Sequence, residues 1–326
     1  MPTPYFALTP EILRLAGAID EFKGGWLAAS KLPPERLAEL EQLAVCQAVA
    51  AGIRLSGGTI SDREVGAVLA GGNLPNQSGV TENIAGHAKV LRLIVSSSAT
   101  IPFTENLVKQ LHRILAKPGA GERRGEYRQS DGDDIGARIR QLLAWTDTAL
   151  QEKQLHPLLV VAAFILRFLV IHPFAEDNQR LSRLFTLLLL LKSGYGFLRY
   201  HALPAVIEEH AAVYEQGLMV GLDRLESDNT VAEAWLETFF GLLLRQSEHV
   251  RAARQQVQQA AGRHSLEQQI LDHLRKHGQT TNKNIQEATG GNRNTIKVRL
   301  RMMVEKGELI KHGVGKGTRY TLGSAA

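Results

Sequence analysis

A short polar segment, residues 171–183, concentrates side chains that could carry out phosphate chemistry. Its sequence, IHPFAEDNQRLSR, holds one imidazole, two carboxylates, two amides and two guanidiniums within thirteen residues. An imidazole accepts a proton near neutral pH, carboxylate oxygens suit Mg²⁺, and a guanidinium binds phosphate through its planar fork. A helix that begins here would add unpaired N–H groups and a favourable dipole. The segment therefore predicts an anion site with a proton acceptor beside it.

Two long apolar runs, residues 158–170 and 184–191, flank this polar segment. Both are rich in Leu, Ala and Phe and are too long for ordinary strands, so we expect two buried helices. Arg167 interrupts the first run, and His156 and His172 stand at its ends. This interruption favours a core helix over a membrane span.

The polar segment resembles the signature of the Fic family, His-Pro-Phe-x-Asp/Glu-Gly-Asn-Gly-Arg-x-x-Arg. The matching residues are His172, Pro173, Phe174, Glu176, Asn178, Arg180 and Arg183. Asp177 and Gln179 stand where the pattern has its two glycines. A match of this length favours the family over a helix–helix connection with chance polar residues.

The resemblance implies a fold, a reaction and a role for each motif residue. The family moves AMP from ATP to a protein hydroxyl of Ser, Thr or Tyr, so His172 would be the general base. Glu176 would hold Mg²⁺ between the α- and β-phosphates, Asn178 would bind the α-phosphate, and Arg180 and Arg183 would bind the β- and γ-phosphates. The alternatives are a structural histidine at a helix end, a solvated carboxylate, and arginines paired with local acids.

The two glycine replacements predict a change in the site. Glycines allow a close backbone approach to phosphate and a positive φ. Asp177 tolerates a left-handed conformation but adds negative charge to the predicted nucleotide-binding region, and Gln179 adds bulk. We expect weakened or altered AMP transfer. The alternative is a degenerate domain that senses a nucleotide or holds a dimer, within a DNA-binding transcriptional regulator.

Three further segments resemble parts of the family. Residues 52–57 align with its inhibitory pattern Ser/Thr-x-x-x-Glu-Gly/Asn, but Ser56 replaces the glutamate that would pair with the second motif arginine. Residues 125–128, Gly-Glu-Tyr-Arg, resemble the element that precedes the family's target-docking flap. The flap itself is shortened or absent, because residues 129–134 lead almost directly into the helix expected from residue 135. Residues 207–214 resemble the helix after the motif, and we expect Tyr214 in the core or at the cleft edge.

Periodicity predicts helices elsewhere in residues 1–255, which we assign to one all-α Fic-like domain. Helices are expected at residues 9–30, from Glu35 to about 51 after a Pro33-Pro34 start, from a Thr81 cap to 96, at 104–115 and from 135, with one or two more in 230–260. Residues 256–264 are polar and are interpreted as a linker. Gly71 to Gly79 has the composition of a loop.

Residues 265–326 resemble a winged helix-turn-helix, a small α+β domain. A capped helix from Ser265 to 276, a short helix capped by Thr280 or Thr281, a Gly290-Gly291 turn and a helix from Asn294 to 306 are expected. Two strands, at 308–312 and 318–322, would form a ribbon around a glycine-rich wing.

Charge separates the two parts of the chain. Residues 251–326 hold 14 Lys and Arg against 5 Asp and Glu, a net charge of +9, whereas the first 250 residues hold 24 against 28, a net charge of −4. The coincidence of charge and motif favours DNA binding over a solvated or protein-binding module. The candidate DNA contacts are Arg293, Asn294, Thr295, Lys297, Arg301, Lys311, Lys316 and Arg319.

Composition indicates the cellular compartment in which we expect the protein. The only cysteine is Cys46, so no intrachain disulfide can form, which fits a reducing cytoplasm. The first residues lack the basic and apolar regions of a secretory signal. We therefore expect a cytoplasmic homodimer that uses ATP and Mg²⁺, acts on a protein target, binds DNA and contacts no membrane.

Overall fold

The computed structural model describes residues 1–28, 32–72, 78–115, 124–129 and 134–323. The side chains of residues 78, 260–265 and 316 also lie outside this description. The chain divides into two compact units, Met1–Ala252 and Ala253–Ala326, and each is presented by itself.

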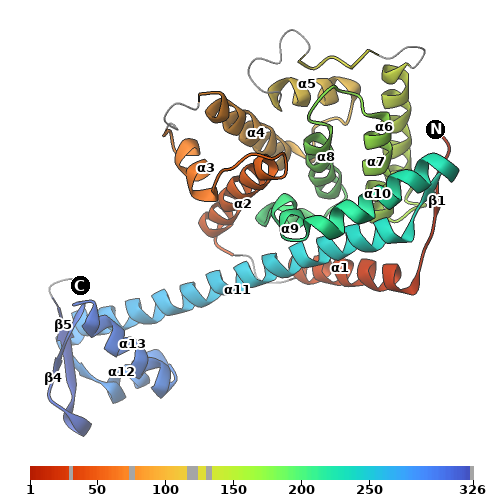
Figure 1. Ribbon diagram of the computed structural model, residues 1–326. Helices are drawn as coiled ribbons and strands as arrows, with labels where there is room; N and C mark the ends of the chain where they lie inside the picture. Colours follow the sequence, from red (N-terminus) through yellow and green to blue (C-terminus); the bar gives the residue numbers. More distant parts are fainter. Residues whose placement is uncertain (29–31, 73–77, 116–123, 130–133, 324–326) are drawn as a thin grey trace. The chain divides into compact units, whose positions relative to one another are not determined.

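The first unit is built almost entirely from helices (Figure 1). They are α1 (Pro10–Ala28), α2 (Pro34–Arg54), α3 (Asp62–Leu69), α4 (Ser78–Ser97), α5 (Glu105–Leu115), α6 (Ile135–Glu152), α7 (Pro157–Ile171), α8 (Asn178–Lys192), the 3-10 helix η2 (Gly196–Tyr200), α9 (Leu203–Glu209), α10 (Ala211–Asp228) and α11 (Glu233–His277). Its described strands, β1 (Tyr5–Phe6) and β2 (Thr230–Val231), form one parallel pair. The predicted all-α domain is confirmed.

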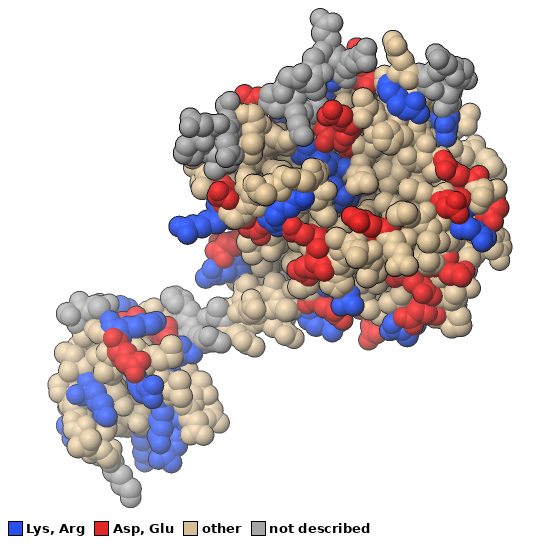
Figure 2. Space-filling model, viewed as in Figure 1, with Lys and Arg blue, Asp and Glu red and all other residues tan. Residues whose placement is uncertain are grey.

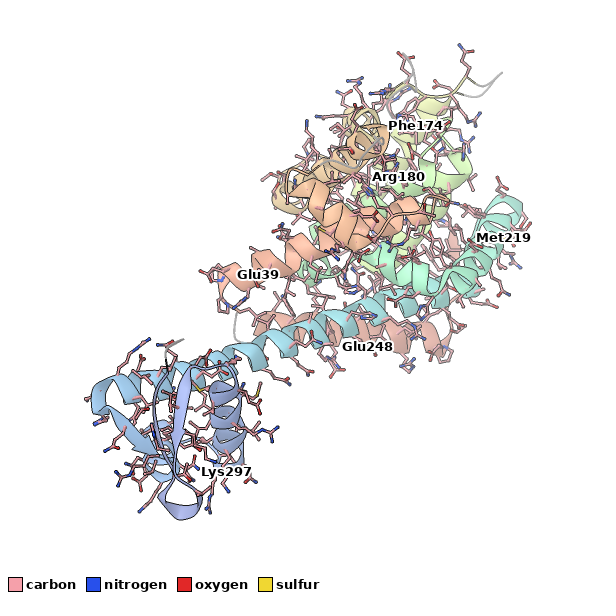
Figure 3. The ribbon with its side chains drawn as sticks, turned by 60° about the vertical axis from the view of Figure 1, so that its left-hand side comes forward. Glu39, Phe174, Arg180, Met219, Glu248 and Lys297 are labelled. Atoms are coloured by element: carbon pink, nitrogen blue, oxygen red, sulfur yellow. The ribbon has the colours of Figure 1, made fainter. Side chains whose placement is uncertain are left out.

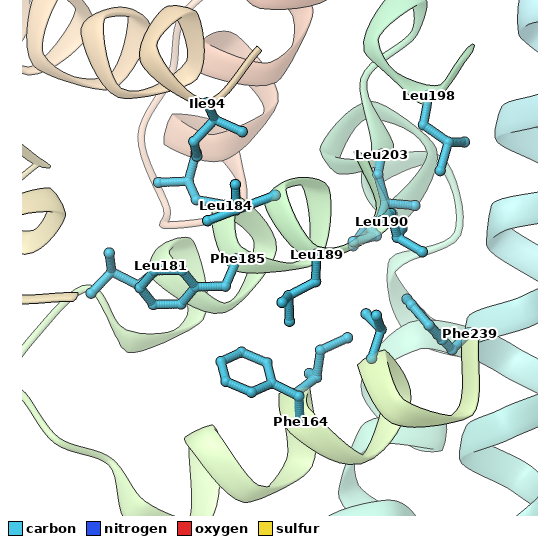
Figure 4. Close-up of a cluster of buried hydrophobic side chains, with 14 of the residues drawn as sticks. Ile94, Phe164, Leu181, Leu184, Phe185, Leu189, Leu190, Leu198, Leu203 and Phe239 are labelled. Carbon is cyan, nitrogen blue, oxygen red and sulfur yellow. The ribbon is translucent and has the colours of Figure 1, made fainter. Parts of the chain in front are cut away.

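The two apolar runs form α7 and α8, which pack against each other in the core. All of α7 except Pro157 and Val170 is buried, because a helix that is apolar all round must lie inside the protein. Phe164 of α7 meets Phe185 of α8 edge to face, with ring centroids 6.0 Å apart. Figure 4 shows this cluster with Leu189 beside it and Phe239 of α11 close by. The helix pair gives the polar segment a rigid support.

Several predicted boundaries are wrong within the first unit. Helix α4 begins at Ser78 and not at the predicted Thr81 cap. The expected helix at 207–214 is broken at His210, because α9 packs on α2 while α10 packs on α7, and one straight helix could not meet both. Helix α3, which was not predicted, has a complete capping box between Ser61 and Glu64.

Residues 256–264, which composition predicts to be a linker, are helical, and α11 runs without a break through the expected Ser265 cap. The segment is rich in Gln, Ala and Arg, all good helix formers. No helix in the described part of the chain is long and apolar enough to cross a membrane.

The second unit is a small α+β fold around the end of α11. It contains β3 (Gln279–Thr281), α12 (Asn282–Thr289), α13 (Arg293–Glu305), β4 (Leu309–His312), a 3-10 turn η3 (Gly315–Gly317) and β5 (Arg319–Leu322). The strand order is β3-β5-β4, antiparallel throughout. The predicted two-stranded ribbon therefore gains a third strand, whose three residues are too short to show a periodic pattern.

Apolar side chains of α11 and α13 form the core of the second unit. Ile270 and Leu274 of α11, Ile296, Leu300 and Met303 of α13 are buried together. Thr281 caps α12 by accepting a hydrogen bond from the Asn284 N–H. Gly290 ends α12 in the left-handed conformation, which opens the turn into α13.

Candidate functional site

The polar segment forms a loop from His172 to Asp177 followed by the first turns of α8. His172 ends α7 in the left-handed conformation, with φ 46°, and its N–H donates to the Phe168 carbonyl at 3.0 Å. Arg128 fixes this loop from outside: its N–H donates to the Pro173 carbonyl at 2.9 Å and its Nε to the His172 carbonyl at 2.7 Å. The Gly-Glu-Tyr-Arg element thus holds the backbone of the candidate base.

Phe174 anchors the loop in the core. Its ring stacks on that of His112 of α5, with centroids 3.8 Å apart and planes 7° apart. His112 Nδ1 accepts a hydrogen bond from the Gly125 N–H at 2.9 Å. Burial lowers the pKa of His112 despite the nearby carboxylates of Asp177 and Glu176, which favours the neutral ring needed for this contact.

Asn178 links the loop to the start of α8. Its side chain is buried, its Oδ1 accepts from the Phe174 N–H at 3.1 Å, and its Nδ2 donates to the Phe174 carbonyl at 2.7 Å. The same Nδ2 lies 3.2 Å from Nε2 of His172. The amide therefore closes the loop and orients the histidine.

Asp177 departs most from the expected arrangement. It is the N-cap residue of α8, with φ 61°, but its side chain makes no capping hydrogen bond. Its Oδ1 instead accepts from Nη1 of Arg180 at 3.0 Å, and both side chains are almost fully buried, at 9% and 3% exposure. The other arm of Arg180, Nη2, donates to Oδ1 of Asn83 in α4 at 2.7 Å. Figure 3 places Arg180 near Phe174 within the first unit. Asp177, which stands where the family pattern has a glycine, thus supplies Arg180 with a counter-ion.

These residues surround an open hollow of about 350 Å³, here termed the motif pocket. It is lined by Ser56, His172, Glu176, Asp177, Asn178, Gln179 and Arg180. Ser56 comes from the turn after α2, where its Oγ donates to the Gly52 carbonyl. Arg54 secures this turn through Glu208 at 2.5 Å and Asp62 at 3.1 Å. The segment aligned with the inhibitory pattern therefore faces the motif.

Arg183 does not line the motif pocket. It lies one turn further along α8, is 7% exposed, and borders a second hollow, here termed the inner cavity, between α2, α4, α8, η2, α9 and α11. Burial lowers the pKa of Arg183, while its hydrogen bond to the Tyr214 hydroxyl opposes this change. Arg180 borders both hollows.

Sequence reasoning missed two partners of the motif arginines. Asn83 binds Arg180 directly. His87 is buried beside both arginines, and burial first and their charges second keep its pKa well below the usual value. Neither residue had a signal in the sequence, because both lie on an ordinary amphipathic helix. The role of Arg128 could have been suspected, since the family element containing it was found.

The described residues contain no ready-made metal cluster of three or more His, Cys, Asp or Glu side chains. Mg²⁺ in nucleotide sites needs only one or two carboxylates, with phosphate oxygens and water completing the shell. Glu176 is exposed and lines the motif pocket, so a carboxylate is present where such an ion would need it.

The candidate DNA contacts occupy exposed positions of the second unit. They are Arg293, Asn294, Thr295, Lys297 and Arg301 on α13, Lys311 on β4 and Arg319 on β5. Figure 3 shows Lys297 on this unit, and Figure 2 shows more Lys and Arg than Asp and Glu on its visible face. The side chain of Lys316 lies outside the described residues. Two of the contacts have protein partners: Arg301 pairs with Glu305 at 3.0 Å, and Arg319 lies 3.5 Å from Gln279 Oε1.

Arg299 differs from its neighbours on α13. Its Nη1 binds Oε1 of Glu267 in α11 at 3.0 Å, and the two side chains are 11% and 17% exposed. This arginine therefore ties α13 to α11, which leaves the exposed side of α13 to the other basic residues.

Comparisons with known proteins agree with both units. Residues 102–190 match the Fic/DOC family, and residues 263–307 match a winged helix-turn-helix DNA-binding family. No curated protein matches the chain.

Solved Fic structures share the fold. A Fic family protein from Desulfovibrio desulfuricans G20 has a TM-score of 0.66 at 21% identity, covering 99% of both chains. A Fic domain containing signaling protein from Bacteroides thetaiotaomicron has a TM-score of 0.55 at 21% identity, covering 75% of this chain and 98% of its own. Fic-1 from C. elegans has a TM-score of 0.60 at 16% identity, covering 76% of this chain and 73% of its own.

Proposed function

We propose that this protein, whose chain carries a Fic domain and a winged helix-turn-helix domain, moves AMP from ATP to a protein hydroxyl with restrained activity and binds DNA through its second unit. The observation that supports the transfer is the motif pocket. It gathers an imidazole, a carboxylate, an amide and a guanidinium around the N-terminus of a fifteen-residue helix. This set matches the needs of a nucleotide's phosphates and an attacking hydroxyl.

The reaction assigns a step to each side chain. A ring nitrogen of His172 takes the proton of the target hydroxyl while that oxygen bonds to the α-phosphorus of ATP. The bond from the α-phosphorus to the bridging oxygen breaks, and pyrophosphate leaves with the electron pair. Glu176 would hold Mg²⁺, which neutralises phosphate charge when bound. Arg180 and the first N–H groups of α8 hold the phosphates.

Asp177 supports the restraint on this activity. Its buried carboxylate already satisfies one arm of Arg180, so an incoming phosphate must share that guanidinium with it. The same contact favours the second candidate function, a domain that senses nucleotide without transferring AMP. In both cases the second unit would bind DNA through the exposed side of α13 and the wing.

Incubation with ATP labelled at the α-phosphate, with Mg²⁺, distinguishes the two functions. Transfer predicts label on this chain or on a protein from the source cell, with at least a hundredfold loss in His172→Ala. A His172→Ala variant that still binds ATP confirms that only the chemistry is lost. ATP binding without any labelled protein would favour the sensing function.

DNA binding is tested by fluorescence anisotropy across a salt series. We expect affinity to fall steeply with salt, since several Lys and Arg side chains would neutralise phosphates. Binding that is absent at low salt would leave the second unit as a protein-interaction domain.

A further inference from the structure

The inner cavity is a second hollow whose lining is mostly aliphatic. It offers about 40 Å³ of free space, and about 10–15 Å³ is enough to admit one water. Most of its lining side chains are Leu, Val and Ala, among them Leu91, Leu187 and Leu203. Among the described residues it has no Phe, Tyr, Trp or acidic side chain, and the imidazole rings of His87 and His201 border it. Its polar lining includes three arginines, so the cavity combines an apolar body with positive charge.

Four buried polar atoms on the cavity lining have no hydrogen-bond partner in the described structure. They are His87 Nδ1, Arg180 Nε, His201 Nδ1 and Gln246 Oε1. Gln246 illustrates the situation: it is 1% exposed, and its Nε2 donates to the Leu198 and His201 carbonyls while its Oε1 stays unpaired. Buried polar atoms are nearly always paired, so four on one cavity indicate bound species of two kinds: Arg180 Nε needs an acceptor, whereas Gln246 Oε1 needs a donor such as water.

Arg183 indicates that a species bound in the inner cavity is negatively charged. Its guanidinium is buried, and no ion pair in the described part of the chain includes it. Its side-chain partner is the neutral hydroxyl of Tyr214. The Asp177 carboxylate attracts this guanidinium only weakly and already pairs with Arg180. A buried cation without an ion-pair partner of its own is unfavourable, and an anion in the cavity would relieve this cost.

We propose that the inner cavity binds a short aliphatic carboxylate. The carboxylate pairs with Arg183 and reaches Nε of Arg180, and the hydrocarbon chain lies among the leucines. A carboxylate matches the planar guanidinium fork. The small volume limits the chain to a few carbons.

This site goes beyond the proposed AMP transfer, but Arg180 connects the two. Its guanidinium borders both hollows, so a carboxylate at Nε and a phosphate at the motif pocket would share one cation. Their bindings should therefore oppose each other, and the coupling must be reciprocal.

The test measures thermal stability and calorimetric heat with sodium butyrate and sodium isovalerate on the full chain. We expect a saturable rise in melting temperature with both, and at least a tenfold weaker effect from butyramide, which has the same chain without the charge. Ala48→Leu, which fills the cavity from α2, should abolish the response. Ala67→Leu, at an exposed position of α3, should leave it intact. A cavity that holds only water gives no carboxylate response, and this result would overturn the proposal.

Arg183→Met tests the assigned carboxylate partner. The variant removes a buried charge that has no ion-pair partner of its own, so we expect it to fold at least as stably as the wild type. It should lose the butyrate response at least tenfold. Failure of ATP binding in the wild type would leave the butyrate test unaffected. Undiminished butyrate binding by Arg183→Met would contradict the assigned carboxylate partner.

Discussion

Asp177→Asn is the substitution that should change nucleotide binding most directly. Asparagine keeps nearly the same shape, tolerates the observed φ of 61°, and can still accept a hydrogen bond from Arg180. What it removes is one negative charge, 3.0 Å from a guanidinium nitrogen that an incoming phosphate would also contact. The substitution therefore isolates the electrostatic effect of the carboxylate that stands in place of the motif glycine.

The geometry gives the expected magnitude. A phosphate oxygen bound on the other side of Arg180 would lie about 6 Å from the Asp177 carboxylate, where two unit charges repel by about 1.4–2.8 kcal/mol at an effective dielectric constant of roughly 20–40. Removing that repulsion should tighten ATP·Mg binding by about 10- to 100-fold. Without nucleotide, the variant should lose about 1–2 kcal/mol of stability, because a buried ion pair becomes a hydrogen bond from a guanidinium to a neutral amide.

Calorimetric titration of ATP·Mg into both proteins measures the affinity, and urea unfolding measures the stability. Asp272→Asn is the matched control, since it makes the same chemical change in an exposed pair with Arg275 in the second unit. It should leave ATP affinity unchanged. An Asp177→Asn affinity equal to or weaker than that of the wild type would refute the idea that this carboxylate competes with phosphate.

The other predictions concern proton linkage and the second unit. Burial first, and the charge of His249 second, lower the pKa of His201 from 6.5 to about 4, so the unfolded chain binds a proton that the folded chain excludes. The stability that His201 contributes is complete above about pH 6.5 and is lost as pH falls towards 4, by at most about 1.4 kcal/mol per pH unit. In urea unfolding at successive pH values, His201→Asn should reduce this dependence of the unfolding free energy on pH. An unchanged dependence would contradict the assignment. Arg293→Ala should weaken DNA binding and lower its salt dependence. Arg299→Ala should mainly destabilise the second unit by removing the contact with Glu267. If the two variants lost the same DNA affinity and were equally stable, this division of roles would be contradicted.

The sequence predicted the fold well where apolar periodicity was strong. The apolar runs on either side of the motif form α7 and α8, as expected. The break at His210 could not be predicted, since it depends on which neighbours α9 and α10 meet. The helical conformation of residues 256–264 was missed because a polar composition was taken as a sign of a linker, although Gln, Ala and Arg favour a helix.

The candidate site was predictable in its residues but not in their partners. The motif fixed which side chains gather around the hollow, yet spacing alone could not show that Asp177 turns towards Arg180. Nor could it separate the two arginines. They lie three residues apart on α8, about 4.5 Å along its axis. Arg180 lines both hollows, whereas Arg183 lines the inner cavity and not the motif pocket.

The position of the Asp177 carboxylate affects how nucleotide binding in the motif pocket could be regulated. In the inhibitory pattern that residues 52–57 resemble, a glutamate on a separate segment opposes the nucleotide, and movement of that segment could relieve the opposition. Here Ser56 faces the motif pocket without a charge, and the opposing carboxylate belongs to the motif loop itself. The backbone of that loop is held by Arg128 and by the Asn178 amide. Movement of the α2 turn alone would therefore not remove the Asp177 charge. Relief would require a change in the Asp177–Arg180 contact, and Arg180 is the residue through which the inner cavity adjoins the motif pocket.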